Sequence, residues 1–321
     1  MATDKNVSLA LGAGGARGFA HIGVIRELQD RGYSISSVAG TSMGALVGGA
    51  FAAGKLDDFS DWATSLNKRD VVMLLDPKAS GPGAIAAEKL FNTLKELIGD
   101  RNIEDLEIPY TAVATDIINQ REVWFQSGDL FTAMRSSISI PGVFTPVAVN
   151  GRILVDGGLM NPIPVEFTAR SQSSKSIAVS LHGKRALPDY TDDKEPGAWR
   201  QWLTNTIGDL RDAGDDAGDA INEAGHEFES PKVDSGDAEV PGAQEITQDF
   251  VDTLKISDIT ALSTDAAQTL VARFRLAAYP PDITVTVPVD SCRTLEFYRA
   301  QEMIDLGRKL AVQSFDKAEL K

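Results

Sequence analysis

A serine with a glycine two residues away on each side stands between an apolar strand pattern and a helical pattern. The motif is Gly40-Thr41-Ser42-Met43-Gly44, with a strand expected over Ser37–Gly40 and a helix over Met43–Ala53. In a Gly-x-Ser-x-Gly turn, the small neighbours permit a sharp bend that lifts the serine hydroxyl above a sheet. The positive end of the following helix points towards this hydroxyl. Ser42 is therefore predicted to be a nucleophile, with a serine cap on a glycine-rich turn as the alternative.

A glycine-rich loop, Gly12 to Gly18, lies one helix earlier in the chain. It joins a strand to a helix, where free backbone amides favour an anion and glycine allows close approach. A dinucleotide-binding turn is an alternative, but that spacing needs glycine where Arg17 stands. It also needs an acidic residue about 20 positions later, where the chain reads Ala39-Gly40-Thr41-Ser42. The loop is expected to hold an anion, while a nucleotide site and a plain tight turn stay open.

A serine nucleophile needs a base, and histidine is the usual one. The chain has three: His21, His182 and His226. His21 is expected to be packed inside the first helix, and His226 to be solvated in an acidic segment. His182 follows a strand expected over Ile177–Leu181, which places it near the carboxyl edge of a parallel sheet. A Ser–His site through His182 is thus open.

A carboxylate offers a second base. Asp156 follows the apolar run Ile153–Val155 and precedes Gly157-Gly158, so it ends a short predicted strand. A carboxylate at such a position is well placed to face an elbow serine. An ordinary Asp-Gly turn is the structural alternative. The residues alone leave Asp156 and His182 both open as the base.

Short apolar strands alternate with helical patterns through most of the chain, which predicts an α/β fold with a mainly parallel central sheet and helices on both faces. The expected strands are Val7–Leu11, Ser37–Gly40, Tyr110–Thr115, Glu122–Gln126, Ile153–Val155, Ile177–Leu181 and Ile283–Val287. The expected helices of the catalytic body are Gly18–Asp30, Met43–Ala53, Leu56–Leu66, Ala86–Ile98 and Gly128–Ser137. Asp129 is expected to open the last of these.

In their order along the chain, the glycine loop, the Ser42 motif and Asp156-Gly157-Gly158 resemble the patatin-like phospholipases, most of all their bacterial branch. The segments Ser139–Phe144 and Asn161–Val165 also resemble that family. The resemblance covers Val7 to Leu181 and resumes weakly over the strand expected at Ile283–Val287.

The resemblance implies a patatin-type three-layer α/β sandwich and a Ser–Asp dyad without histidine. Ser42 would be the nucleophile, Asp156 the base, and the amides of Gly14, Gly15, Ala16 and Arg17 the oxyanion hole. The implied reaction is hydrolysis of acyl esters of phospholipids, lysophospholipids or related lipids through an acyl-enzyme, with no metal or organic cofactor. Two alternatives stay open: an esterase with a Ser-His-Asp triad through His182, and an inactive lipid-binding or regulatory member of the fold.

The composition excludes several classes of protein. The chain has 321 residues, a formal net charge of -15 and 43% hydrophobic residues, enough for a full-sized core rather than a disordered chain. An acidic chain is not expected to bind nucleic acid through charge. Its single cysteine, Cys292, cannot form an intramolecular disulfide. No apolar stretch approaches a membrane span of about 18 residues, and no signal peptide is recognisable, so we expect a cytoplasmic protein, with peripheral membrane contact left open.

Most of the negative charge is concentrated in one segment. Residues Asp189 to Asp252 include 18 acidic and 4 basic residues. A narrow apolar seam recurs within this segment from Leu203 to Phe228 at three- and four-residue steps, which predicts a helix. We therefore expect a catalytic core over 1–187, an acidic and largely helical insertion over 188–275, and a return to the core over 276–321 with a final strand and a C-terminal helix. Residues Ala198–Phe274 are predicted to gate access to a lipid-sized cleft. A homodimer interface through this segment is the alternative.

Overall fold

The computed structural model describes residues 5–75, 83–85, 88–170, 173–184 and 256–320. The chain divides into two compact units, one formed by residues 1–192 and 266–321 and the other by residues 193–265. The central sheet and the site lie in the first unit. The acidic segment from Asp189 to Asp252, with its predicted seam from Leu203 to Phe228, lies outside the described residues.

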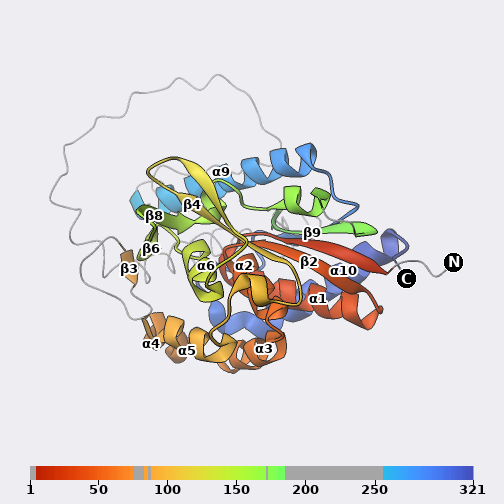
Figure 1. The fold of residues 1–321 in the computed structure, drawn as a ribbon, viewed down its shortest axis with the longest axis horizontal. Coiled ribbons are helices and arrows are strands. Elements are labelled where there is room, and N and C mark those ends of the chain that lie inside the picture. The colour runs from red at the N-terminus through yellow and green to blue at the C-terminus, as the bar shows by residue number, and fades with distance from the viewer. Residues whose placement is uncertain (1–4, 76–82, 86–87, 171–172, 185–255, 321) are drawn as a thin grey trace, which may run out of the picture. The chain divides into compact units, whose positions relative to one another are not determined.

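A central sheet organises the first unit (Figure 1). The strand order among the described residues is β10-β9-β1-β2-β4-β8-β7, and β5 pairs with β4 beside this path. Parallel pairing joins β10, β9, β1, β2 and β4, whereas β5, β8 and β7 pair antiparallel to their neighbours. The strands are β1 (Asn6–Leu11), β2 (Ser34–Thr41), β4 (Tyr110–Asp116), β5 (Arg121–Phe125), β7 (Val147–Val149), β8 (Arg152–Asp156), β9 (Lys175–Gly183) and β10 (Ile283–Pro288).

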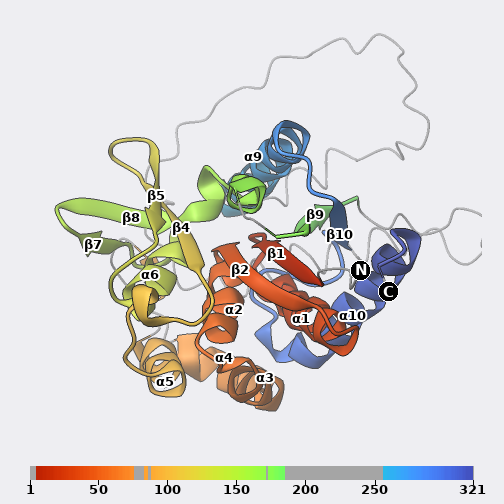
Figure 2. The ribbon, with the colours of Figure 1, turned by 45° about the vertical axis from the view of Figure 1, so that its right-hand side comes forward.

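Helices complete the layers on both faces of the sheet (Figure 2). The helices are α1 (Ala20–Asp30), α2 (Met43–Ala52), α3 (Leu56–Ser65), α4 (Lys68–Leu75), α5 (Glu88–Ile98), α6 (Leu130–Ser137), α9 (Ile256–Ala278) and α10 (Ala300–Lys317). A separate pair of short parallel strands joins β3 (Gly83–Ile85) to β6 (Gly142–Phe144). None of the described helices is long and apolar enough to cross a bilayer.

The alternation of side chains along β1 explains the layers, because successive strand residues point to opposite faces. Leu9 and Leu11 pack in the main core with the helices on one face. Ala10 packs on the other face, in a smaller cluster that includes Ala272 of α9. All three side chains are fully buried, as expected for a strand covered on both sides.

The described end of the predicted insertion packs on this second face. Arg275 of α9 forms ion pairs with Glu166 and with Glu122 of β5. The pairs hold the last turns of α9 on the sheet face that carries Ala10. The predicted gating role of Ala198–Phe274 therefore concerns residues that lie mostly outside the described part of the chain, and it stays a prediction.

The predicted fold class is confirmed: the sheet is mostly parallel and lies between helical layers. Several elements depart from the expected pattern, among them the short strands β3, β6 and β7, which were not predicted. Strand β8, which ends at Asp156, pairs antiparallel to β4, although the sequence pattern gave no direction for it. Helix α4 was not predicted, but a local signal for it exists, because the Asn67 side chain accepts hydrogen bonds from the amides of Arg69 and Asp70. The Asp70 carboxylate in turn accepts a hydrogen bond from the Asn67 amide, so the two residues cap the helix reciprocally, as in a capping box.

Candidate active site

Ser42 lies at the sharp turn between β2 and α2, in a backbone conformation that side chains rarely adopt. Its φ is 55° and its ψ is −125°, which costs about 1–3 kcal/mol for a residue other than glycine. The turn is tight enough that a Cβ at Gly44 would lie 2.1 Å from the Leu11 carbonyl oxygen. The fold therefore keeps a strained serine at the end of a central strand, as a nucleophile elbow requires.

Asp156 is the hydrogen-bond partner of this serine. The Ser42 hydroxyl donates to Oδ2 of Asp156 over 2.5 Å, and the Gly158 amide donates to Oδ1 over 2.7 Å. Both side chains are buried, each 4% exposed. The two oxygens of one carboxylate therefore have separate partners, and one of them faces the serine.

The direction of β8 explains how Asp156 reaches Ser42. Strand β4 extends past the end of β2, with Thr41 beside Val113, and β8 runs back along this extension. Asp156 then pairs with Ala114, one residue beyond the level of Thr41. An antiparallel strand would ordinarily end at the opposite edge, but this register brings its last residue to the edge where β2 ends.

Burial changes the acidity of Asp156. Desolvation raises the pKa of its carboxyl to about 6, although the hydrogen bonds from Ser42 and Gly158 act in the opposite direction. A carboxylate with this pKa is a stronger base than a solvent-exposed one and is still ionised at neutral pH.

A raised pKa also predicts how the protein's stability depends on pH. The folded state holds the Asp156 proton more tightly than the unfolded state, so this group stabilises the fold below its ordinary pKa and loses that effect as pH rises through about 6. We expect Asp156→Asn to raise the free energy of unfolding by about 1–3 kcal/mol at mildly alkaline pH. The gain should disappear in acid, and urea unfolding at both pH values measures it.

A carboxylate with the opposite shift serves as the control for this measurement. Asp282 accepts hydrogen bonds from the Ser176 amide and hydroxyl, and its pKa is lowered, mainly by the first of these. Asp282→Asn should therefore destabilise the protein, and more so above the pKa of that carboxyl than below it. Loss of stability on Asp156→Asn at alkaline pH would contradict the expected burial cost.

The glycine loop contributes Gly15 to the cavity that Ser42 also lines. Within the described part of the chain, the Gly14 and Gly15 amides donate to no acceptor. Gly15 has a φ of +56° and lines the same cavity as Ser42, and a Cβ there would lie 2.4 Å from the Thr294 carbonyl oxygen. The Ala16 amide is already engaged, because it donates to Thr294 over 2.9 Å. Two amides of the loop therefore have no acceptor among the described residues.

Two side chains hold the loop in place. The buried Arg17 guanidinium donates to the carbonyls of Gly14 and Val289. His21 is fully buried, and its Nε2 is 2.8 Å from the Gly12 carbonyl oxygen. Burial lowers the pKa of His21 to about 4, so the ring is neutral. These hydrogen bonds fix the Gly12 and Gly14 carbonyls of the loop, and Arg17 also ties the loop to Val289, the residue after β10.

The strand order separates His182 from Ser42. His182 lies near the end of β9, and β1 separates that strand from β2. The structure joins the Ser42 hydroxyl to Asp156 instead. His226 lies outside the described residues.

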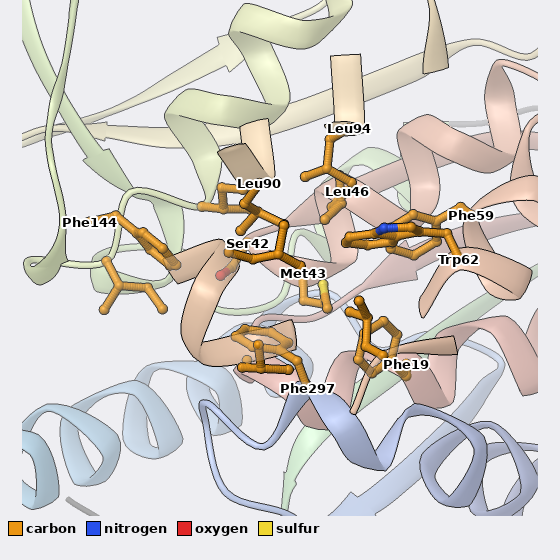
Figure 3. A pocket seen from close by; sticks show the side chains of 16 residues that line it. Phe19, Ser42, Met43, Leu46, Phe59, Trp62, Leu90, Leu94, Phe144 and Phe297 are labelled. Atoms are coloured by element: carbon orange, nitrogen blue, oxygen red, sulfur yellow. The ribbon is translucent and has the colours of Figure 1, made fainter. Parts of the chain in front are cut away.

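An apolar cavity opens beside Ser42 (Figure 3). The centre of a water-sized sphere can move through about 50 Å³ of it, and the cavity is partly open to solvent. Every lining residue except Ser42 and Gly15 has an apolar side chain: Phe19, Met43, Leu46, Phe59, Trp62, Leu66, Val71, Leu74, Leu90, Leu94, Ile138, Ile140, Phe144 and Phe297. The lining therefore suits a hydrocarbon chain next to a serine hydroxyl.

Sequence reasoning missed most of this cavity. Its walls come from α3, α4 and α5 and from Phe297, near the far end of the chain. Amphipathic spacing indicates that such residues are buried, but not whether they line a cavity or fill the core. Ser137 was also missed; its buried hydroxyl accepts a hydrogen bond from the Ser42 amide over 2.9 Å.

Comparison with known proteins places this arrangement in context. Residues 9–169 match the family model described as patatin-like phospholipase. An uncharacterised NTE family protein of Mycobacterium tuberculosis is 41% identical over 338 residues, covering 99% of this chain and 93% of that protein.

Two longer eukaryotic proteins match over a smaller part. Patatin-like phospholipase domain-containing protein 7 of Mus musculus is 32% identical over 63% of this chain and 16% of its own length. The lysophospholipase NTE1 of Yarrowia lipolytica is 32% identical over 62% of this chain and 14% of its own length. In both cases the chain spans a minor part of the relative.

Proposed function

This chain belongs to the patatin-like phospholipase family, and we propose that it is a serine hydrolase that cleaves acyl esters of lipids through an acyl-enzyme. The observation that carries the proposal is the hydrogen bond from Ser42 to the buried Asp156 carboxylate, beside an apolar cavity. The dyad replaces the histidine of a triad by a carboxylate whose pKa is raised to about 6.

In the proposed reaction, the Ser42 oxygen attacks the ester carbonyl carbon while its proton passes to Oδ2 of Asp156. The carbonyl oxygen becomes an oxyanion, which the Gly14 and Gly15 amides stabilise; each such donor is worth about 10²–10³ in rate. The Arg17 amide stays in this proposal, whereas the Ala16 amide already has an acceptor.

Collapse of this intermediate releases the alcohol, which takes the proton back from Asp156. Water then attacks the acyl-enzyme and gives its proton to the same carboxylate. The acid product leaves as the proton returns to Ser42. The proposed cycle uses the Asp156 carboxylate as the base in both steps and requires no cofactor.

The apolar cavity supports a lipid acyl chain as the part of the substrate that is recognised. Phospholipids, lysophospholipids and related lipid esters share such a chain, and the printed name of the Yarrowia lipolytica relative supports including lysophospholipids. We further propose that the substrate comes from a lipid surface, which vesicle flotation tests. We also propose that the protein forms a homodimer, which light scattering tests.

Filling the cavity should alter chain-length preference more than the chemistry. Leu90 of α5 lines the cavity (Figure 3), so we expect Leu90→Trp to lower kcat/KM for p-nitrophenyl palmitate at least about tenfold relative to the butyrate. Leu97→Trp is the matched control, because Leu97 lies on the same helix and packs against the core without lining the cavity. An equal loss on both esters would argue against an acyl pocket.

Covalent labelling tests the proposed function directly. A fluorophosphonate should modify the wild-type protein at Ser42, and mass spectrometry of the labelled peptide identifies the site. An inactive member of the fold would not react. Labelling at another serine would contradict the assignment of the nucleophile.

A further inference from the structure

The chain leaving α6 contacts the main chains of both Ser42 and Asp156. The Ser137 hydroxyl accepts a hydrogen bond from the Ser42 amide over 2.9 Å and donates one to the Val113 carbonyl over 2.6 Å. Two residues later, the Ser139 carbonyl accepts a hydrogen bond from the Asp156 amide over 2.8 Å. Ser137 and Ser139 are both fully buried.

The sheet by itself does not join the two partners. Strand β4 separates β2 from β8, and Ser42 already lies beyond the last paired residue of β2. The Ser42 amide therefore has no partner on a neighbouring strand and bonds a side chain instead. Without a fixed support, the left-handed φ of Ser42 would relax towards a more favourable conformation.

We propose that Ser137 is a positioning residue, which holds the Ser42 main chain at the level where its hydroxyl meets Asp156. This inference rests on the function proposed above. Ser137 touches neither the reacting oxygen nor the carboxylate, and it acts through the amide of Ser42. The Ser137 hydroxyl also donates to the Val113 carbonyl of β4. It therefore ties the Ser42 turn to the strand whose next residue, Ala114, pairs with Asp156.

The role requires a hydroxyl, because one small group must accept and donate at the same time. Alanine would leave the Ser42 amide and the Val113 carbonyl buried without that partner, and each such loss is unfavourable. The elbow would then shift, and a displacement of about 1 Å can lower a rate about 10²-fold.

The neighbouring contacts make the segment rigid enough for this role. The Arg135 guanidinium donates to the Ser139 hydroxyl over 2.6 Å and to the Thr145 carbonyl over 2.8 Å. The Ser139 hydroxyl in turn donates to the Arg135 carbonyl over 2.8 Å. The Arg135 guanidinium also lies 3.9 Å from the centroid of the Phe91 ring. These contacts hold both ends of the segment that meets Ser42 and Asp156.

Ser137→Ala tests the inference, with Ser136→Ala as a matched control. Ser136 is equally buried on α6, but its hydroxyl donates to the Thr132 carbonyl of its own helix. We expect Ser137→Ala to lower kcat for p-nitrophenyl butyrate about 10- to 100-fold with little change in KM, and Ser136→Ala to keep wild-type kcat. Ser137→Cys, which keeps the size with a weaker hydrogen-bonding group, takes the place of the alanine variant if that protein does not fold.

A pH profile separates positioning from a general loss of stability. The hydrogen bond from Ser42 lowers the pKa of Asp156, so displacement of Ser42 should move the acid limb of kcat/KM to higher pH. A merely structural residue would reduce the amount of active protein and leave this limb in place.

Wild-type kcat in Ser137→Ala, an equal loss in Ser136→Ala, or an unchanged acid limb would each overturn the positioning role. Failure of the proposed function has a different signature. In that case the wild-type protein would not hydrolyse the ester, or Ser42→Ala would hydrolyse it as fast.

Discussion

Ser42→Ala is expected to lower kcat for p-nitrophenyl butyrate by about 10⁴- to 10⁶-fold. The reason is chemical, because the acyl-enzyme cannot form without the Ser42 oxygen. The alanine keeps the backbone conformation of the elbow and fits the same space, so the variant should remain folded. Initial rates, together with thermal unfolding to verify the fold, measure the effect.

The control for this variant is a serine that is buried but outside the site. Ser136→Ala removes a hydroxyl from the same core, and its kcat should stay at the wild-type value. If Ser42→Ala kept a tenth or more of the wild-type rate, another nucleophile would have to carry the reaction.

Asp156→Asn is expected to lower kcat by about 10³- to 10⁴-fold, because the amide cannot take the proton of Ser42. Asparagine keeps the size of the side chain and a carbonyl oxygen for the Gly158 amide, so the loop should hold its shape. The same carboxylate predicts the pH dependence of the wild-type enzyme. Because the pKa of Asp156 is raised to about 6 and only the ionised form is a base, kcat/KM should fall as pH drops below this value.

His182→Ala separates the dyad from a histidine-based triad. His182 lies two strands from β2, and Ser42 bonds Asp156, so a folded His182→Ala variant should keep most of the wild-type kcat. The opposite pattern, with Asp156→Asn active and His182→Ala inactive, would replace the dyad by a Ser–His mechanism.

The elbow around Ser42 was predictable because its determinants are local. A Cβ at Gly40 would lie 2.3 Å from the Gly44 carbonyl oxygen, within the turn itself, and the helix that follows starts at Met43, directly after Ser42. The strands near the site were also predictable, since Tyr110–Asp116 and Lys175–Gly183 contain the apolar runs from which they were expected. Asp129 opens α6 as predicted, because its side chain accepts a hydrogen bond from the Thr132 amide.

The partner of Ser42 was not decided by such local patterns. Asp156 and His182 both follow apolar strands, and both were reasonable bases at a sheet edge. Strand order and the antiparallel register of β8 bring Asp156 to Ser42. Neither property is visible in a strand of five residues, because pairing is settled by other segments of the chain.

By itself, the sequence determined the layered α/β class, the strained serine turn and the glycine loop, because short-range sterics and the spacing of apolar residues set these features. Only the tertiary structure decided which candidate base meets Ser42, which loop amides have no acceptor among the described residues, and which side chains enclose the apolar cavity. Those features join residues as distant along the chain as Phe19, Ser42, Asp156 and Phe297. Such contacts depend on how the helices and strands pack together, and no single segment of sequence contains that information.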